Sequence, residues 1–336
     1  MPNGFGYVTK GVGGLYTVRL LPPSSPALAS ALGDRYDPQP LDGAVVSARA
    51  RNLRRGDGLL VGDLVEVTYT TKSYTVRDGV PVPDPDGTDL AIVRVLPRRS
   101  SLIRPPVANL DFLFLTVAAA APAPDLETVD KMLCIAVHNA IAPVVVVNKC
   151  DLDPESADRL CAIYRAVGIP VFRATGITGE GVPALSDYIS SVIPGKLAVF
   201  AGASGVGKST LLGRIFPQAT FETGDISRRI ARGKNTTRHV EIHPLSSAPD
   251  TGYLADTPGF TMLDFERFDF FSLDDLPAAF PEFVPFLGSC RYTDCTHTKE
   301  TDCAICAAVR AGVIPASRHR TYLSLYETLK KKPKWK

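Results

Sequence analysis

The chain has 336 residues, of which 45% are hydrophobic and 21% are charged, with a formal net charge of +2. This length exceeds that of most single hydrophobic cores, so two or three domains are expected, and the composition excludes a disordered chain. No apolar run is long enough to span a membrane, and the start of the sequence does not resemble a signal peptide. We therefore expect a cytoplasmic protein without membrane association, whose small net charge leaves any affinity for nucleic acid to local basic clusters.

Residues 1–102 are predicted to form a small β-barrel, because short β-rich runs alternate there with clusters of Gly, Pro and Asp. The predicted strands are Tyr16–Leu20, Ala44–Ala48, Leu64–Tyr69 and Ala91–Leu96. The same region contains the basic residues Arg49, Arg51, Arg54 and Arg55. Because small barrels of the OB type commonly bind single-stranded nucleic acid, RNA binding is one interpretation of these arginines, and ordinary solvation is the other.

Residues 103–272 are predicted to form a doubly wound α/β domain, because buried apolar strands alternate there with helical stretches. The predicted strands are Phe112–Val117, Pro143–Val147, Leu197–Ala201 and Tyr253–Ala255. The predicted helices are Leu126–Asn139, Glu155–Val167 and Lys208–Ile215.

A phosphate-binding loop follows the third of these strands and precedes a helix, in agreement with the pattern G-x-x-x-x-G-K-[ST]. The expected nucleotide-binding residues are Gly202, Ala203, Ser204, Gly205, Val206, Gly207, Lys208, Ser209 and Thr210. Glycines let the backbone wrap around a phosphate chain and point its N–H groups inward at the start of a helix. We expect Lys208 to bridge the β- and γ-phosphates and Ser209 to bind Mg²⁺.

The segment Asn148-Lys149-Cys150-Asp151 predicts that the base is guanine. It follows a buried strand, at the edge where open α/β sheets bind ligands. Asp151 can accept paired hydrogen bonds from guanine N1–H and the N2 amine, which adenine does not offer, so a P-loop ATPase or kinase is the less favoured alternative. Asn148 and Lys149 are expected to brace the base and the loop.

The remaining phosphate contacts are predicted in two later segments. Asp256-Thr-Pro-Gly259 has the D-x-x-G pattern, in which Asp256 reaches Mg²⁺ through water and the amide of Gly259 senses the γ-phosphate. Between the P-loop and this motif, one of Thr236 and Thr237 is expected to complete the Mg²⁺ shell, and the spacing leaves open which. We group Lys208, Thr236, Thr237 and Asp256 as the catalytic residues.

The motifs occur in a permuted order. In ordinary small GTPases the P-loop comes first and N-K-x-D follows D-x-x-G, whereas here N-K-x-D comes first and D-x-x-G comes last. Such a permutation costs little when the original termini lie close together. One consequence is that the chain after Gly259 leads directly into the C-terminal region.

Residues 273–336 are predicted to form a metal-binding, partly helical domain that ends in a basic tail with Trp335. Together with Arg318 and Arg320 this tail is a second candidate RNA-binding surface, and an ordinary solvated tail is the alternative. Cys290, Cys295, His297 and Cys303 supply three thiolates and one imidazole, a complete tetrahedral set for structural Zn²⁺. On spacing alone, Cys306 competes with Cys303. Free cysteines are the alternative for the whole cluster.

The permuted order, with a barrel before it and a Cys/His cluster after it, resembles the bacterial ribosome small-subunit-dependent GTPase A (RsgA) family. The resemblance also includes Gly62-Asp63 and the segment Arg104–Asp111. It implies an OB-fold, a permuted GTPase domain and a zinc domain, and it favours Cys303 over Cys306. It further implies binding to the 30S subunit and its 16S rRNA late in maturation, with hydrolysis of GTP to GDP and phosphate that is stimulated by the ribosome. Separately, we expect a monomer. A passive RNA-binding module is the second alternative.

Two positions depart from the usual pattern. The base-contacting loop, normally Ser-Ala, is Arg173-Ala174 here, and we expect Ala174 to offer its backbone N–H to guanine O6. Phe260 follows Gly259, where many GTPases carry a water-orienting glutamine, so slow intrinsic hydrolysis is expected. The missing group is then expected from a rearranged loop, with His239 as one candidate, or from the ribosome, and an exposed loop histidine is the alternative for His239.

Overall fold

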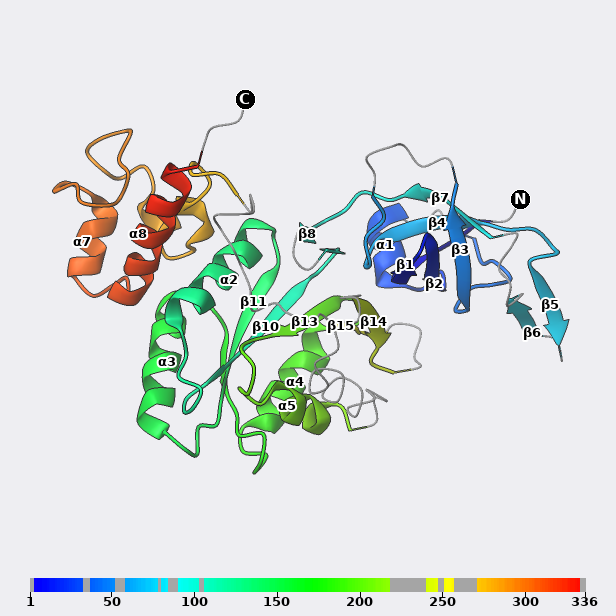
Figure 1. Ribbon diagram of the computed structural model, residues 1–336, viewed down its shortest axis with the longest axis horizontal. Helices are drawn as coiled ribbons and strands as arrows, with labels where there is room; N and C mark the ends of the chain where they lie inside the picture. Colours follow the sequence, from blue (N-terminus) through cyan, green and yellow to red (C-terminus); the bar gives the residue numbers. More distant parts are fainter. Residues whose placement is uncertain are drawn as a thin grey trace. The chain divides into compact units, whose positions relative to one another are not determined.

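The computed structural model describes residues 3–32, 37–51, 58–77, 80–83, 90–102, 106–217, 240–246, 251–256 and 271–332 (Figure 1). The chain divides into two compact units. The first comprises Met1–Asp111, Tyr188–Val199 and Gln218–Gly259, and the second comprises Phe112–Asp187, Phe200–Pro217 and Phe260–Lys336. Each unit thus draws on distant parts of the chain, and the domain boundaries at residues 102 and 272 stay predictions.

The N-terminal region is a closed barrel of five strands in the order β1-β2-β3-β7-β4, as expected from the sequence. These strands are β1 (Asn3–Val12), β2 (Leu15–Leu20), β3 (Val45–Ala50), β4 (Leu64–Thr68) and β7 (Ala91–Val95). Their inward side chains form one apolar core that includes Val18, Val65 and Ile92. Gly6 is required where β1 and β2 approach closely, because a Cβ there would lie 2.3 Å from the carbonyl oxygen of Arg19.

Smaller elements accompany the barrel. Helix α1 (Pro26–Leu32) follows β2, and the hairpin of β5 (Tyr74–Arg77) and β6 (Val80–Pro83) is separate from the barrel sheet. The short pair β8 (Ser101–Leu102) and β9 (Val107–Ala108) follows the barrel. The turn of Gly62 carries positive φ of 89°, and Asn109 donates from Nδ2 to the carbonyl of Gly62 at 2.9 Å.

The α/β region contains a six-stranded sheet in the order β12-β11-β10-β13-β15-β14. Parallel pairing joins β10 (Phe112–Ala118) to β11 (Ala142–Asn148) and β11 to β12 (Val171–Arg173). Strand β13 (Leu197–Ala201) is parallel to β15 (Tyr253–Asp256), and β14 (Glu241–Pro244) is antiparallel to β15. This topology confirms the predicted α/β class.

The helices of this region are α2 (Leu126–His138), α3 (Pro154–Ala166), α4 (Val182–Val192) and α5 (Lys208–Ile215). Local sequence explains where two of them begin. Asp125 caps α2 by accepting from the N–H of Glu127 at 3.1 Å, and Asp153 caps α3 by accepting from the N–H of Ser156 at 2.9 Å, with Pro154 in the first turn. All seven residues of β10 are buried, as in a strand covered on both faces.

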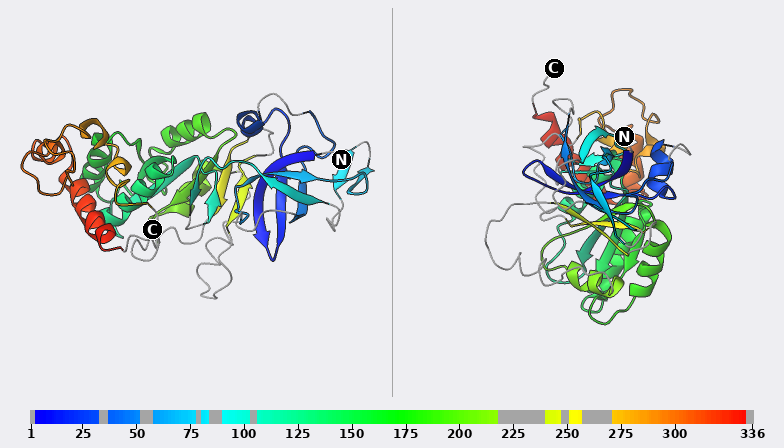
Figure 2. Two further views of the ribbon diagram at one scale, coloured as in Figure 1. Left: turned by 90° about the horizontal axis from the view of Figure 1, so that it is seen from above. Right: turned by 90° about the vertical axis from the view of Figure 1, so that its right-hand side faces the viewer.

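The C-terminal segment contains two short 3₁₀ turns, η1 (Pro277–Ala279) and η2 (Val284–Phe286), and the helices α7 (Ala304–Arg310) and α8 (Ala316–Lys330). Phe280, Phe283 and Tyr322 form an aromatic core, with ring centroids 4.9 to 5.5 Å apart. Helix α8 packs against α2 (Figure 2), where Thr321 donates from Oγ1 to Asp130 Oδ2 at 2.9 Å. In the part of the chain that the structure describes, no helix combines the length and the apolar character that a membrane span needs.

Candidate nucleotide site and metal centre

The P-loop connects β13 to α5, and its backbone explains its glycines. Gly202, Gly205 and Gly207 have φ of 139°, 80° and 93°, values that favour glycine. A Cβ on Gly202 would lie 2.1 Å from the carbonyl oxygen of Thr116, and one on Gly207 would lie 2.3 Å from Nδ2 of Asn148. Glycine is therefore required at positions 202 and 207 for two reasons, the positive φ of the turn and the neighbouring atoms that leave no room for a Cβ.

Lys208 lies at the start of α5 and turns its side chain back over the loop. Its Nζ donates to the carbonyls of Gly202 and Ala203, at 2.7 and 2.9 Å. Burial lowers the pKa of the Lys208 ammonium. Ala203, Ser204 and Gly205 are exposed, as are Ser209 and Thr210, so the predicted phosphate-binding loop presents its outer face to solvent.

Asn148 joins three segments of the site. It is buried at the end of β11, donates from Nδ2 to the carbonyl of Val206 at 2.8 Å, and accepts at Oδ1 from the N–H of Gly176 at 3.0 Å. The amide thus holds the P-loop against the loop that follows β12. The structure brings together the predicted phosphate and base motifs through this one side chain.

The next three residues form a tight turn after β11. Lys149 has φ of 60° and donates from Nζ to the carbonyl of Ala121 at 2.5 Å. Cys150 is buried and donates from Sγ to the carbonyl of Val147 at 3.2 Å. Asp151 is exposed, at the carboxyl end of the strand, where the sequence predicts the guanine contact.

The expectation for Ala174 is corrected by the backbone pairing. Its N–H donates to the carbonyl of Val147 at 2.8 Å, within the parallel pairing of β11 and β12, and the residue is buried. This N–H is therefore not available to guanine O6. Arg173 forms an ion pair with Asp158 of α3 and does not belong to the exposed loop.

The exposed loop beside Asn148 comes later in the chain, at residues 175–181. Thr175 donates its N–H to the carbonyl of Glu180 at 2.9 Å, Gly179 donates to the carbonyl of Thr175 at 2.7 Å, and Ile177 is 76% exposed. Arg214 of α5 donates to the carbonyls of Gly176 and Ile177. No motif in the sequence indicated Arg214, because the contact joins positions 38 and 37 residues apart.

Other predicted contacts have no described side chains. Thr236, Thr237, His239, Gly259 and Phe260 lie outside the described residues, as do Arg54, Arg55 and Trp335. Asp256 is the last residue of β15, and its backbone pairs with that of Glu241 in β14. The roles of these residues stay predictions.

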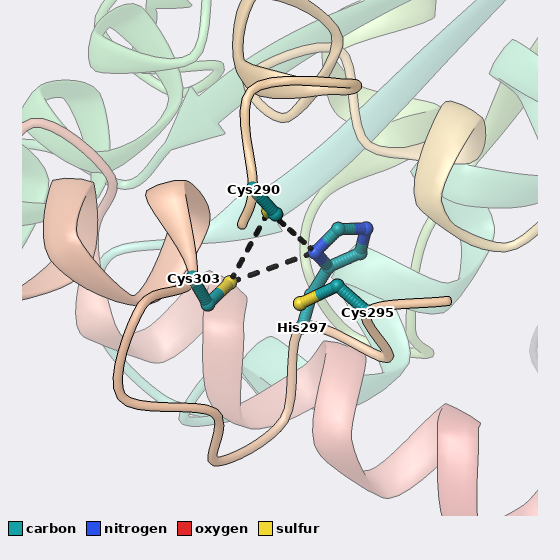
Figure 3. A group of neighbouring side chains, drawn as sticks. All are labelled: Cys290, Cys295, His297 and Cys303. Atoms are coloured by element: carbon teal, nitrogen blue, oxygen red, sulfur yellow. Dashed lines mark hydrogen bonds between the residues drawn. The ribbon is translucent and has the colours of Figure 1, made fainter. Parts of the chain in front are cut away.

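The metal cluster is formed by Cys290, Cys295, His297 and Cys303, whose ligand atoms all lie within 4.8 Å of one another (Figure 3). Sγ of Cys290 lies 3.8 Å from Sγ of Cys303, and each of these sulfurs lies 3.5 Å from Nδ1 of His297. A tetrahedral zinc ion with ordinary bond lengths requires about 3.8 Å between two sulfurs and about 3.5 Å between sulfur and nitrogen. The residues therefore fit one structural Zn²⁺.

The surroundings of the cluster favour one of the two competing cysteines. Cys303 precedes α7 and accepts at Sγ from the N–H of Cys306 at 3.4 Å, while Cys290 accepts from the N–H of Ala304 at 3.4 Å. Such N–H donors stabilise thiolates. The thiol of Cys306 instead donates to the carbonyl of His297 at 3.7 Å and lies outside the group of four, so the geometry favours Cys303, and its role as the ligand stays a prediction.

The loop that carries Cys295 and His297 is braced by Glu300 and by α8. Glu300 accepts from the N–H groups of Thr296, Thr298 and Lys299 at 2.9 to 3.0 Å. Burial by itself raises the pKa of this carboxyl, and the hydrogen bonds from Thr296 and the backbone outweigh it, so the pKa is lowered to about 2. His319 of α8 donates from Nε2 to the carbonyl of His297 at 2.8 Å.

A buried ionic cluster ties this segment to the α/β region. Arg318 of α8 is fully buried and pairs with Asp130 of α2 at 2.9 Å and with Glu282 at 2.6 Å. Its guanidinium lies 4.7 Å from the ring centroid of Phe280. The expectation that Arg318 belongs to an RNA-facing basic surface is therefore wrong, because its side chain is fully buried. Its pairing with Asp130 and Glu282 was not predicted, because an arginine and two carboxylates this far apart in the chain give no local signal.

Comparison with known proteins agrees with this architecture. The family model for the RsgA GTPase matches residues 95–266. The small ribosomal subunit biogenesis GTPase RsgA of Caldanaerobacter subterraneus is 36% identical over 293 residues, which cover 86% of this chain and 90% of that protein. The protein of the same name from Agathobacter rectalis is 33% identical over 333 residues, covering 98% and 99%.

Two solved structures are similar over nearly their whole length. YloQ, described as a circularly permuted GTPase, has a TM-score of 0.67 at 26% identity, with 99% of this chain and 98% of that chain covered. YjeQ from Thermotoga maritima has a TM-score of 0.71 at 27% identity, with 99% and 100% covered. With its barrel, permuted motifs and Cys/His cluster, the chain belongs to the RsgA GTPase family and is a GTP hydrolase.

Proposed function

We propose that this GTPase binds the 30S ribosomal subunit late in its maturation and hydrolyses GTP to GDP and phosphate in response to it. The observation that carries the proposal is the extent of the match with proteins named small ribosomal subunit biogenesis GTPase. The alignment covers 98% of this chain and 99% of one such relative, and therefore includes the barrel and the metal cluster as well as the nucleotide motifs. A chain that shared only the nucleotide function would not need those flanking parts.

The phosphate end of the site would be held by the P-loop backbone and by Lys208, which already lies over the loop carbonyls. Ser209, one of Thr236 and Thr237, and Asp256 through water would hold Mg²⁺, and this ion would neutralise charge that develops on the phosphates. Phe260 cannot orient water, so the group that activates the nucleophile is expected from His239 or from the ribosome.

Guanine would be read by Asp151 and by the loop at residues 175–181. Asp151 is exposed at the end of β11 and would accept from N1–H and the N2 amine. Since Ala174 uses its N–H inside the sheet, we assign the O6 contact to the backbone N–H of Ile177, the exposed residue after Gly176. This assignment replaces the one made from the sequence.

Contact with 16S rRNA would involve both ends of the chain. Arg49 is exposed on β3 of the barrel, and Arg291, Lys299, Arg310 and Arg320 are exposed or partly exposed in the C-terminal segment. The zinc ion would fix the loops that present part of this second surface, and it has no open position for chemistry. We expect the protein to act in the cytoplasm as a monomer.

The test is GTP hydrolysis by the purified protein with and without 30S subunits, with ATP and the Lys208→Ala variant as controls. The proposal predicts a large stimulation by 30S that is specific to GTP and absent in the variant. An unchanged rate with saturating 30S, despite tight GTP binding, would remove the ribosome as the activating partner. It would then favour a passive RNA-binding protein in which the nucleotide is structural.

A further inference from the structure

We propose that Arg214 is a positioning residue for guanine recognition, which aims the backbone N–H groups of the loop at residues 175–181 toward the base. The proposal rests on the guanine site described above, and it adds a residue that belongs to none of the nucleotide motifs. Arg214 lies in the last turn of α5, the helix that begins with the P-loop lysine, Lys208. One helix would then serve both ends of the nucleotide.

Two consecutive carbonyls converge on the Arg214 guanidinium. Its Nε donates to the carbonyl of Gly176 at 2.5 Å, and its Nη2 donates to the carbonyl of Ile177. A Cβ on Gly179, where φ is 89°, would lie 3.0 Å from Nη1 of Arg214. The loop therefore folds closely around the guanidinium, which approaches the peptide groups themselves.

Because the peptide bond is planar, an arginine that fixes a carbonyl group also fixes the direction of the N–H group that follows it. In a trans peptide the C=O and the following N–H point in opposite directions. Because Arg214 holds the carbonyls of Gly176 and Ile177, it also directs the N–H groups of Ile177 and Thr178 away from itself. Two successive N–H groups with a fixed direction form a site for a carbonyl oxygen such as guanine O6.

A second contact fixes the other side of the same loop. The N–H of Gly176 donates to Oδ1 of Asn148 at 3.0 Å, and Asn148 is held by the P-loop carbonyl of Val206. Gly176 is thus held at its N–H by Asn148 and at its carbonyl by Arg214. Losing the arginine would leave Asn148 in place and free the part of the loop that follows Gly176.

The guanidinium shape is part of the inference. Arg has several donors in a rigid planar fork, which can bind two neighbouring carbonyls at once, whereas Lys offers a single flexible ammonium. Arg214 also lies where a cation is favourable for the dipole of α5, and this purely structural role would be filled by Lys equally well. Arg214→Lys therefore separates positioning of the loop from a general stabilisation of the helix.

The experiment measures the affinities of three diphosphates for the full chain. GDP carries O6, N1–H and the 2-amino group, and IDP keeps O6 and N1–H but lacks the amino group. The 2-aminopurine ribonucleoside diphosphate keeps the amino group and lacks both O6 and the hydrogen on N1, so the O6 contact is judged from how each variant changes its affinity relative to GDP. The variants are Arg214→Ala and Arg214→Lys. Arg159→Ala is the control, since Arg159 is exposed and forms an ion pair 3.8 Å long with Glu155 within α3.

We expect both Arg214 variants to weaken GDP and IDP by about tenfold, the effect of losing a charge-assisted hydrogen bond, and to weaken the 2-aminopurine nucleotide by less than about twofold. The preference for GDP over IDP should not change, since Asp151 reads the 2-amino group. An equal loss for all three nucleotides, or no loss in Arg214→Lys, would overturn the proposal.

The wild-type protein in the same experiment tests the guanine site independently. A wild type that binds GDP no better than the 2-aminopurine nucleotide lacks an O6 contact, and the positioning role then fails together with that contact. A wild type that selects GDP while both Arg214 variants keep the full selectivity retains the guanine site and refutes Arg214 alone. Thermal unfolding of each variant confirms that the measured protein is folded.

Discussion

The nucleotide site and the C-terminal segment of the same unit are held together in different ways. In the nucleotide site, loops are fixed mainly through backbone groups: glycines at positive φ, carbonyls that receive Lys208 and Arg214, and N–H groups that bind Asn148. In the C-terminal segment, side chains meet side chains, at the Cys/His cluster and around Arg318. The second region should therefore be more sensitive to single substitutions than the first.

The largest effect is expected from loss of the metal. Structural zinc contributes about 10 kcal/mol or more to the folding of small zinc-binding peptides, because the ligands alone do not close the site. Cys303→Ser should release the ion and unfold the segment from residue 290 to 303. Loss of the ion is measured as the zinc content per chain, and unfolding is measured as the protease sensitivity of the C-terminal segment.

Cys306→Ser is the matched control, since its thiol donates to the carbonyl of His297 and lies outside the group of four ligands, although it neighbours Cys303. It should keep one zinc per chain. Equal zinc loss in both variants would contradict the assignment of Cys303 as the ligand.

A smaller effect is expected from Arg318→Ala. This change leaves Asp130 and Glu282 buried without their cation, and breaking a buried ion pair in this way costs about 3–5 kcal/mol. The free energy of unfolding, measured in urea, should fall by that amount. Arg320→Ala, two residues away on the exposed face of α8, should change it by less than about 0.5 kcal/mol. A similar loss of unfolding free energy in the two variants would show that the buried ion pairs of Arg318 do not contribute more to stability than an exposed arginine does.

In the nucleotide site, Asn148→Ala tests a buried side chain that joins the P-loop to the loop after β12. It leaves the carbonyl of Val206 and the N–H of Gly176 without a partner, which should cost about 1–3 kcal/mol of unfolding free energy. Nucleotide binding should weaken as well. Asn139→Ala, which removes one bond to the carbonyl of Ile135 within α2, is the control. Equal changes in unfolding free energy and in nucleotide affinity for the two variants would show that the side chain of Asn148 does not hold the loops together.

The pH dependence of the metal-binding loop should be the smallest of these effects, since Glu300 is partly solvated. Its pKa is lowered to about 2 in the folded protein, from an ordinary value of 4.5, so its contribution to stability is complete above about pH 4.5. The contribution is lost as the pH falls toward 2. Glu300→Gln should therefore be less stable than the wild type at pH 7, with the difference shrinking in acid. A stability difference that grows in acid would show that the ionised carboxylate of Glu300 destabilises the folded protein, which contradicts the prediction.

Local spacing explains which parts of the site were predictable from the sequence. The P-loop, Asn148 to Asp151 and the Cys/His cluster each lie within a short stretch of chain, and the structure places Asn148 against the P-loop and the four metal ligands together. Spacing alone left Cys303 and Cys306 as alternatives, and the side-chain directions at the start of α7 agree with Cys303, which the resemblance favoured.

What could not be predicted depends on pairing between distant residues. Ala174 resembled a base contact until the register of β11 and β12 showed that its N–H is used in the sheet. Arg214 and Arg318 act through partners at least 36 residues away in the chain, and neither belongs to a motif. Composition and periodicity do not predict such contacts. They indicate which face of a helix or strand is buried, but not where a single hydrogen-bond donor lies.

The guanine site assembled from these permuted segments is tested most directly by binding of GDP and XDP to Asp151→Asn. Xanthine carries an oxygen in place of the 2-amino group, so an amide at position 151 can donate where the carboxylate accepted. The site predicts that the wild type prefers GDP strongly and that the variant loses GDP affinity and gains XDP affinity. A variant that keeps its preference for GDP would show that Asp151 does not read the base.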